Sequence, residues 1–148
     1  MKQIELNGLI WDDKNIILNE KNLLNWEVAM SCPKSDGWRL PTIDELKALA
    51  ELGSTWDNVL KGRWFGPDSE LLGESKESVF LPAEGWMDRN GTLDHVGYYG
   101  GYWSASPNGS LAHYLSFYSG VAYPAGNDHR MHGFSVRLVK DVKPSVKR

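Results

Sequence analysis

The stretch GWRLPTIDELKALAEL (residues 37–52) carries the strongest local structural signal in the chain. Thr42 and Glu45 have the spacing of a capping box, in which each side chain bonds the backbone N–H of the other residue. The apolar stripe that follows consists of Ile43, Leu46, Leu49 and Ala50. Gly53 comes next, and glycine after the last turn is a frequent helix stop. The pattern therefore predicts a helix that begins at Thr42 and ends at Gly53.

Two further elements are predicted on the N-terminal side of this helix. In IELNGLIWDD (residues 4–13) the pair Asn7-Gly8 stands between apolar residues, which is typical of a tight hairpin turn. In LNEKNLLNWEVAM (residues 18–30) the apolar residues recur at mostly helical spacing, and Pro33 follows as a stop. The first third of the chain is therefore predicted to form a hairpin and two helices.

After Gly53 the chain changes character. Gly, Pro, Ser, Asn and Asp recur every few residues, and short apolar pieces such as VFLP, GYWSAS, YLSF and FSVRLV lie between them. This texture predicts short strands and long loops. Leu115 and Phe117 are expected on one face of a strand, with Tyr114, Ser116 and Tyr118 on the other. Phe134, Val136 and Leu138 are expected to share a face of a later strand.

We expect a single α+β domain over residues 1–148, in which two N-terminal helices pack on a twisted, loop-rich antiparallel β region. Its core spans about residues 8–141, and residues 142–148 form a basic tail. At least one of Arg39 and Arg137 is expected to make an internal salt bridge. The residues expected in the core are Trp38, Leu40, Leu46, Leu49, Trp103, Leu115, Phe117, Val136 and Leu138.

The bulk properties exclude several classes of function. A net charge of −3 and a pI near 5.8 argue against a nucleic-acid partner, which would require a basic face. No signal peptide and no membrane span are visible, so we expect no membrane insertion. The location stays open between a phage particle, a cell surface reached by another route, and the cytoplasm. The single cysteine, Cys32, excludes an internal disulfide and a zinc site built on several thiolates.

The residues give no pattern typical of an enzyme or of a bound cofactor, so neither is expected. Cys32 has no neighbouring histidine and is interpreted as structural. Asp128, His129 and His132 could bind a metal if a fourth ligand approached them, and this remains an alternative function. The segment DRNGTLD (residues 88–94) has calcium-like spacing, but a hairpin turn at Asn90-Gly91 explains it more simply.

The stretch VAYPAGNDHRMHGF (residues 121–134) fits neither a helical nor a strand period. Together with the preceding residues from 108 onward it combines Tyr, His, Arg, Met and Phe with Ser, Asn and Gly. Rigid aromatic residues mixed with small polar ones are the composition of antibody-like binding surfaces. The alternative is that these aromatic side chains fill the core of a loop-rich domain.

A series of motifs spanning about Gly8 to Asp141 favours the binding surface. The motifs GLIWDD, NWEVAM, GWRLPTIDEL, FLPAEGWMDRNGTL, GGYWSAS, FYSG and GFSVRLVKD occur in this order. The series resembles the bacterial major-paralogous-domain family and the C-terminal domain of collagen-like adhesins. That resemblance implies a C-type-lectin-like fold of the formylglycine-generating-enzyme type. The C-terminal block also resembles the variable region of diversity-generating-retroelement target proteins.

In such variable proteins a fixed scaffold alternates with positions that are diversified. The resemblance implies a scaffold of Tyr102, Trp103, Ser104, Ser106, Ala112, Leu115, Phe117, Ser119, Gly120, Gly133, Ser135, Val136, Arg137 and Val139. The implied ligand-binding positions are Asn108, Ser110, Leu111, His113, Tyr114, Ser116, Tyr118, Tyr123, Ala125, Asp128, His129, Met131, His132 and Phe134.

The chain also departs from its relatives in ways that limit what the resemblance implies. One cysteine cannot supply the active-site cysteines of the formylglycine-generating enzymes, so their activity is not expected. The calcium-binding motifs of sugar-binding C-type lectins are represented only by GND at residues 126–128. We therefore expect a receptor-binding or display module for a protein or glycan on another cell. A structural subunit whose aromatic face forms an oligomer interface, such as a trimer, is a further alternative.

Overall fold

Helix α2 (Ile43–Glu51) lies where the sequence predicts it. The Thr42 hydroxyl accepts a hydrogen bond from the Glu45 N–H at 3.2 Å, and a Glu45 carboxylate oxygen accepts one from the Thr42 N–H at 2.8 Å. The capping box and the helix predicted over residues 42–53 are thus confirmed. Leu46 and Leu49 are buried by the helix. Gly53 follows at φ +105°, a left-handed conformation that favours glycine.

Helix α1 (Trp26–Ser31) is shorter than predicted. It begins at Asn25, whose side chain accepts a hydrogen bond from the Val28 N–H at 2.9 Å. The helix prediction is wrong for residues 18–25, because residues 18–21 form a tight turn with Asn19 and Glu20 at positive φ, and Leu24 bridges to Phe134. Leu23 and Leu24 are buried from this non-helical backbone, so their apolar spacing reflects core packing and not a helical turn.

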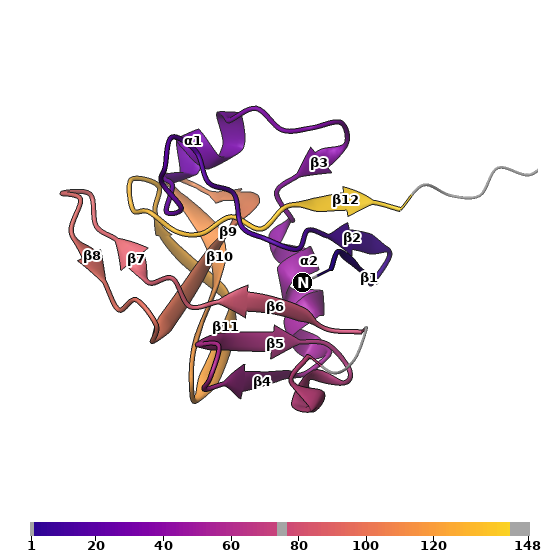
Figure 1. Cartoon of the computed structure of the whole chain (residues 1–148). Helices are drawn as coiled ribbons and strands as arrows, with labels where there is room; N and C mark the ends of the chain where they lie inside the picture. Colours follow the sequence, from indigo (N-terminus) through magenta and orange to yellow (C-terminus); the bar gives the residue numbers. More distant parts are fainter. Residues whose placement is uncertain (1, 74–76, 143–148) are drawn as a thin grey trace, which may run out of the picture.

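The computed structural model describes residues 2–73 and 77–142, which form an α+β fold made mainly of antiparallel sheets (Figure 1). A four-stranded sheet joins both ends of the described chain in the order β1-β2-β12-β3. Its strands are β1 (Ile4–Leu6), β2 (Leu9–Trp11), β12 (Val139–Asp141) and β3 (Trp38–Arg39). The hairpin predicted at Asn7-Gly8 is confirmed, with both residues at positive φ and Leu6 paired to Leu9.

A three-stranded sheet and a small hairpin occupy the middle of the chain. The sheet has the order β4-β5-β6, from β4 (Ser54–Asp57), β5 (Gly62–Phe65) and β6 (Val79–Pro82), with the 3-10 helix η1 (Ser69–Leu71) beside it. The hairpin consists of β7 (Trp86–Met87) and β8 (Leu93–Asp94). Asp88 closes its turn by accepting hydrogen bonds from the N–H groups of Asn90 and Thr92, each at 2.9 Å. The turn predicted at Asn90-Gly91 is thus confirmed.

The third sheet has the order β9-β10-β11 and consists of β9 (Tyr99–Asn108), β10 (Leu111–Tyr118) and β11 (Val121–His129). Because opposed residues of antiparallel strands share a face, the register defines two faces. The inner face carries Tyr102, Leu115 and Phe117, all buried. The outer face carries Tyr99, Trp103, Tyr114, Ser116, Tyr118 and Tyr123. The predicted separation of Leu115 and Phe117 from Tyr114, Ser116 and Tyr118 is confirmed.

Strand β11 corrects the prediction that residues 121–134 lack regular structure. Residues 121–129 pair with β10 throughout, except at a bulge where Pro124 and Ala125 face the single residue Leu115. Proline lacks an N–H, but β11 lies at the edge of its sheet, where no further strand requires one. The bulge also breaks the two-residue alternation, which is why no strand period is visible in the sequence.

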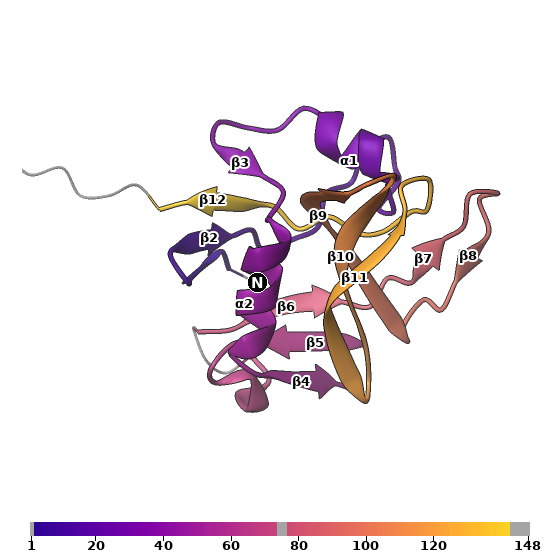
Figure 2. The ribbon, with the colours of Figure 1, turned by 180° about the vertical axis from the view of Figure 1, so that it is seen from behind.

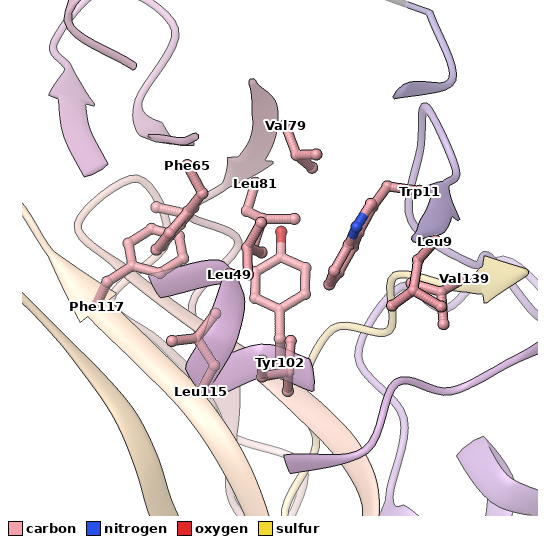
Figure 3. Packing of buried hydrophobic residues seen from close by; sticks show 12 residues of the cluster. Leu9, Trp11, Leu49, Phe65, Val79, Leu81, Tyr102, Leu115, Phe117 and Val139 are labelled. Atoms are coloured by element: carbon pink, nitrogen blue, oxygen red, sulfur yellow. The ribbon is translucent and has the colours of Figure 1, made fainter. Parts of the chain in front are cut away.

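Helix α2 stands between the four-stranded sheet and the β9-β10-β11 sheet, as both views of the ribbon show (Figures 1 and 2). Leu46 and Leu49 of this helix join the inner face of β9–β11 in one apolar cluster. Figure 3 shows the hydroxyl-bearing ring of Tyr102 in the middle of this cluster, with Trp11 to one side and Leu81 above it. The Tyr102 hydroxyl is satisfied there because it donates to the Pro82 carbonyl at 2.7 Å.

A second apolar cluster covers one end of the outer face. Trp103, Ala112, Phe134 and Val136 pack there against the segment that leads into α1. The Trp103 indole N–H donates to the Leu24 carbonyl at 2.8 Å, which fixes that segment. Phe134, Val136 and Leu138, which were expected to share a face, pack in this one cluster, and all three are buried. Of the three only Phe134 forms an isolated bridge, and regular pairing begins only at Val139.

The predicted core is confirmed except at Trp38, which is only partly buried and lies beside the ammonium group of Lys140. The predicted salt bridge is made by Arg39, which bonds Glu45 at 2.7 and 2.8 Å and Asp141 at 2.9 Å. Arg137 is buried and donates instead to the Asn15 side chain and the Asp12 carbonyl. It therefore ties the C-terminal segment to the loop after β2.

Two expectations concern the limits of the chain. Within the described ranges, neither helix has the length and apolar character that crossing a bilayer requires. Residues 143–148 of the predicted basic tail lie outside the described residues.

Candidate functional site

The outer face of β9–β11 is open at the end that bears Tyr118 and Tyr123, and a groove of about 720 Å³ runs along it. Six of its lining residues are Trp or Tyr, and they are contributed by β4, β7, β9, β10 and the segment before β9. They are Trp56, Trp86, Tyr98, Tyr99, Tyr114 and Tyr118. Phe134 lies at the buried side of the same groove. We call this feature the aromatic groove.

Glycines at positions 100 and 101 explain how β9 packs so closely on both faces. A Cβ atom at Gly100 would overlap the Phe117 ring, and one at Gly101 would overlap the Phe134 ring. Phe117 belongs to the inner face, whereas Phe134 lies against the outer face. The GG pair therefore lets two aromatic rings lie directly on the β9 backbone, one on each side.

The tyrosines of the outer face are linked in pairs. The Tyr99 hydroxyl donates to the Tyr114 hydroxyl at 3.2 Å, and the hydroxyls of Tyr118 and Tyr123 are 2.9 Å apart. Burial, and secondarily the hydrogen bond with Tyr114, raises the pKa of the Tyr99 hydroxyl above its ordinary value. Tyr99 thus presents a neutral phenol to the groove. Tyr118 and Tyr123 are 41% and 48% exposed, so a binding partner can reach both.

Asp128 places a carboxylate in the groove. Its Oδ1 accepts a hydrogen bond from the His129 N–H at 2.7 Å and lies 2.9 Å from Nδ1 of His132. The second contact is at ion-pair distance, but the ring N–H is poorly directed for a hydrogen bond. Within residues 2–73 and 77–142, no group donates a hydrogen bond to Oδ2 of Asp128. One carboxylate oxygen is therefore free to meet a ligand.

The residues of the metal alternative are only partly brought together. The His129 and His132 rings are 5.6 Å apart, and His132 packs on Trp86 at 5.2 Å between ring centres. In the described parts of the chain, no three His, Cys, Asp or Glu side chains form a group that could hold a metal ion.

Apart from Ala125, which lies midway along β11, the remaining predicted ligand-binding residues form a second region at the end of the β10–β11 hairpin opposite Tyr118. Asn108 donates to the Asn127 side chain, and Leu111 pairs with His129 across the strands. Ser110 and Met131 are exposed, and Ala125 is exposed in the bulge. His113 lies at the edge of this region, with Nδ1 3.2 Å from the Gly126 carbonyl.

Arg130 separates this second region from helix α1. Its guanidinium lies 4.4 Å from the centre of the Trp26 ring and donates to the carbonyls of Leu111 and Gly109. Through these contacts Arg130 stabilises the turn between β9 and β10. The guanidinium of Arg130, the cationic group nearest to Asp128 in sequence, is therefore already engaged by other groups.

Two members of the predicted set are buried. Ser116 is 5% exposed, and Phe134 is 1% exposed and stacks on Tyr114 with ring centres 4.6 Å apart. Neither can give a ligand much contact area. Ser116 and Phe134 therefore contribute to packing, and their prediction as ligand-binding residues is corrected.

Several groove residues were not in the predicted set, namely Trp56, Lys61, Trp86, Tyr98 and Tyr99. They lie outside the C-terminal block: Trp56 and Lys61 come from the β4–β5 hairpin, Trp86 comes from β7, and Tyr98 and Tyr99 come from the start of β9 and the residue before it. The only signal for them in the sequence is the high aromatic content, with seven Trp and six Tyr. Composition of this kind indicates a binding surface without showing which residues form it.

Comparison with known proteins places the chain in a family. The model of the family described as Domain of unknown function (DUF8237) matches residues 49–139, which is more than half of the chain. The chain therefore belongs to this family. The matched range contains every groove residue named above. No curated protein and no solved structure matches the chain.

Proposed function

We propose that this member of the DUF8237 family is a ligand-recognition module that binds a protein or glycan through the outer face of β9–β11. In this proposal it is a receptor-binding or display protein of phage or bacterial origin. It acts without catalysis, and the contact residues are centred on Tyr114, Tyr118 and Tyr123.

One observation supports the proposal more than any other, namely how burial divides the C-terminal block. The positions assigned to a fixed scaffold are buried apart from Ser106, Ser119 and Gly120. The positions assigned to ligand contact are half-buried or exposed apart from Ser116 and Phe134. A protein whose surface residues vary while its core residues are kept requires buried scaffold positions and exposed contact positions, because buried substitutions destabilise a fold far more than exposed ones.

We further propose that the fold is C-type-lectin-like. The motifs that suggest it occupy ordered parts of the α+β fold: WRLPT leads from β3 into α2, and YWSAS lies within β9. SVRLV leads into β12, which closes the sheet with β2. Fold likeness does not identify the ligand, so the ligand has to be found by experiment.

The direct test is a binding screen of purified protein against glycans and against bacterial surface proteins. A ligand found in this way should bind at least several-fold more weakly to Tyr118→Ala and to Tyr123→Ala, since a central aromatic contact contributes roughly 1–2 kcal/mol or more. Ile17→Ala is the matched control, because Ile17 is 70% exposed and does not line the groove. Equal loss in all three variants would contradict the proposal.

The oligomeric state distinguishes a ligand surface from a subunit interface. Light scattering on wild type and Tyr118→Ala measures the mass directly. A trimer that dissociates in the variant would show that the outer face holds copies of the chain together, and the proposal would then fail.

The genomic surroundings test the origin of the variable surface. The proposal expects a reverse transcriptase gene nearby and a near-repeat of the codons for residues 103–139 that differs mainly at adenines. A repeat whose mismatches fell on codons for buried positions such as Trp103 and Phe117 would contradict the assignment of scaffold and contact residues.

A further inference from the structure

We propose that the aromatic groove binds a protein ligand by receiving one of its lysine or arginine side chains beside Asp128. This inference rests on the proposed function, since it names the chemistry by which the same surface would recognise its partner.

The groove has an acidic end and a basic end. Asp128 stands opposite Ala112 on β10, whereas Tyr118, six residues further along β10, stands at the other end. Six residues of a strand span about 20 Å. Lys61, from the turn between β4 and β5, belongs to the Tyr118 end, because neighbouring Arg63 donates to the Tyr118 and Ser119 carbonyls at 3.2 and 3.3 Å.

The acidic end lacks an internal cation that fully satisfies it. Among the described lining residues Asp128 is the only carboxylate, and its Oδ2 accepts no hydrogen bond there. Arg130 is engaged with Trp26 and with two carbonyls. A carboxylate with one free oxygen in an aromatic surrounding attracts a cation more strongly than one surrounded by water.

The surrounding side chains suit an organic cation better than a sugar. Trp86 and Tyr114 line this end, and Tyr99, whose backbone pairs with Tyr118, reaches Tyr114 with its hydroxyl. Aromatic rings attract ammonium and guanidinium groups as well as their apolar stems. A sugar ring needs several unsatisfied donors and acceptors, but the hydroxyls of Tyr99 and Tyr114 already bond each other. The net charge of −3 also favours a cationic partner over an anionic one.

The test is a titration with capped amino acids, monitored by tryptophan fluorescence and by NMR shifts of the Trp86 indole N–H. The cationic probes are N-acetyl-arginine amide and N-acetyl-lysine amide. N-acetyl-norleucine amide supplies an apolar chain without charge, and methyl glucoside represents glycans. Saturable binding of the cationic probes, and none of norleucine or glucoside, is the expected result.

The variants locate the site within the groove. Asp128→Asn should weaken binding of the arginine probe at least tenfold, whereas Asp128→Glu should retain most of it. Asp44→Asn is the matched control, because it removes the same charge from an exposed residue outside the groove, and it should change binding less than twofold. Raising NaCl from 0.05 to 0.5 M should weaken binding several-fold in wild type, which tests the charge even if Asp128→Asn does not fold.

Three outcomes would overturn the inference: unchanged binding in Asp128→Asn, insensitivity to salt, or tighter binding of the norleucine or glucoside probe. Its failure is distinguishable from failure of the proposed function. If a surface ligand depends on Tyr118 and Tyr123 while the arginine probe does not bind, only the present inference fails. If the probe binds but no screened ligand depends on Tyr118 and Tyr123, the proposed function fails and a cation site remains.

Discussion

Phe117 and Tyr118 are adjacent in β10, but replacing Phe117 by alanine should mainly lower the stability of the fold, whereas replacing Tyr118 should mainly weaken ligand binding. Phe117 is fully buried, and its ring contacts Phe65 and Tyr102 at 5.6 and 6.1 Å between ring centres. Removing a buried phenyl ring leaves a cavity and costs about 3–5 kcal/mol of unfolding free energy. Tyr118 is 41% exposed, and its loss should cost less than about 1 kcal/mol.

Urea denaturation followed by tryptophan fluorescence measures both effects. With an m-value of about 2 kcal/mol/M, Phe117→Ala should lower the urea midpoint by about 2 M, and Tyr118→Ala by less than about 0.5 M. Binding should show the reverse order, because only Tyr118 lies on the outer face. The assignment of inner and outer faces would be refuted if the two variants lost similar stability, or if Phe117→Ala lost less than about 1 kcal/mol.

Two other predictions concern β9 and the Arg39 ion pairs. Gly100→Ala should lose about 1–3 kcal/mol in the same denaturation assay, because its methyl group would overlap Phe117, whereas Gly120→Ala has open space and should change stability by less than about 0.5 kcal/mol. Hydrogen bonds from Arg39 lower the pKa of the Glu45 carboxyl from its ordinary 4.5 and that of the Asp141 carboxyl from its ordinary 3.8. The stability these acids contribute is therefore present above about pH 5 and is lost as the pH falls through the lowered pKa values. Arg39→Gln should flatten this acid-side loss in thermal melts from pH 6 to 2.5, and an unchanged slope would contradict the assignment.

Local chemistry made part of the fold predictable. The capping box of Thr42 and Glu45 uses contacts between residues three apart, so it operates wherever the helix lies in the fold. The turns at Asn7-Gly8 and Asn90-Gly91 are local in the same sense. Each was correctly predicted because the bonds that define it involve only neighbouring residues.

Features set by distant contacts were not predictable in the same way. Leu24 is extended because it bridges to Phe134, which is 110 residues away. Pro124 is tolerated in β11 because no strand lies beyond that edge, and a single sequence does not reveal strand order. Both errors arose where tertiary pairing overrode a local pattern.

The residues of the candidate site also fall into those that local sequence patterns predict and those that distant contacts bring into place. Tyr114 and Tyr118 followed from strand alternation and from the resemblance, because both signals lie within one strand. Trp56, Lys61 and Trp86 could not be included, since other hairpins bring them to the groove. The burial of Phe134 was missed because Gly101, which makes room for its ring, is 33 residues earlier.

The pairing of β2 with β12 has a consequence for synthesis on the ribosome. Residues 9–11 emerge early, but their hydrogen-bonded partners are residues 139–141. A nascent chain cannot complete this sheet until almost all of the domain has been translated. Trp11 shares an apolar cluster with Val139 and cannot pack against it until Val139 has been synthesised. At a translation rate of about 5–20 residues per second, this delay lasts roughly 6–26 seconds. During that interval the chain depends on its hairpins and α2, and a chaperone that shields exposed aromatic side chains should raise the yield of folded protein.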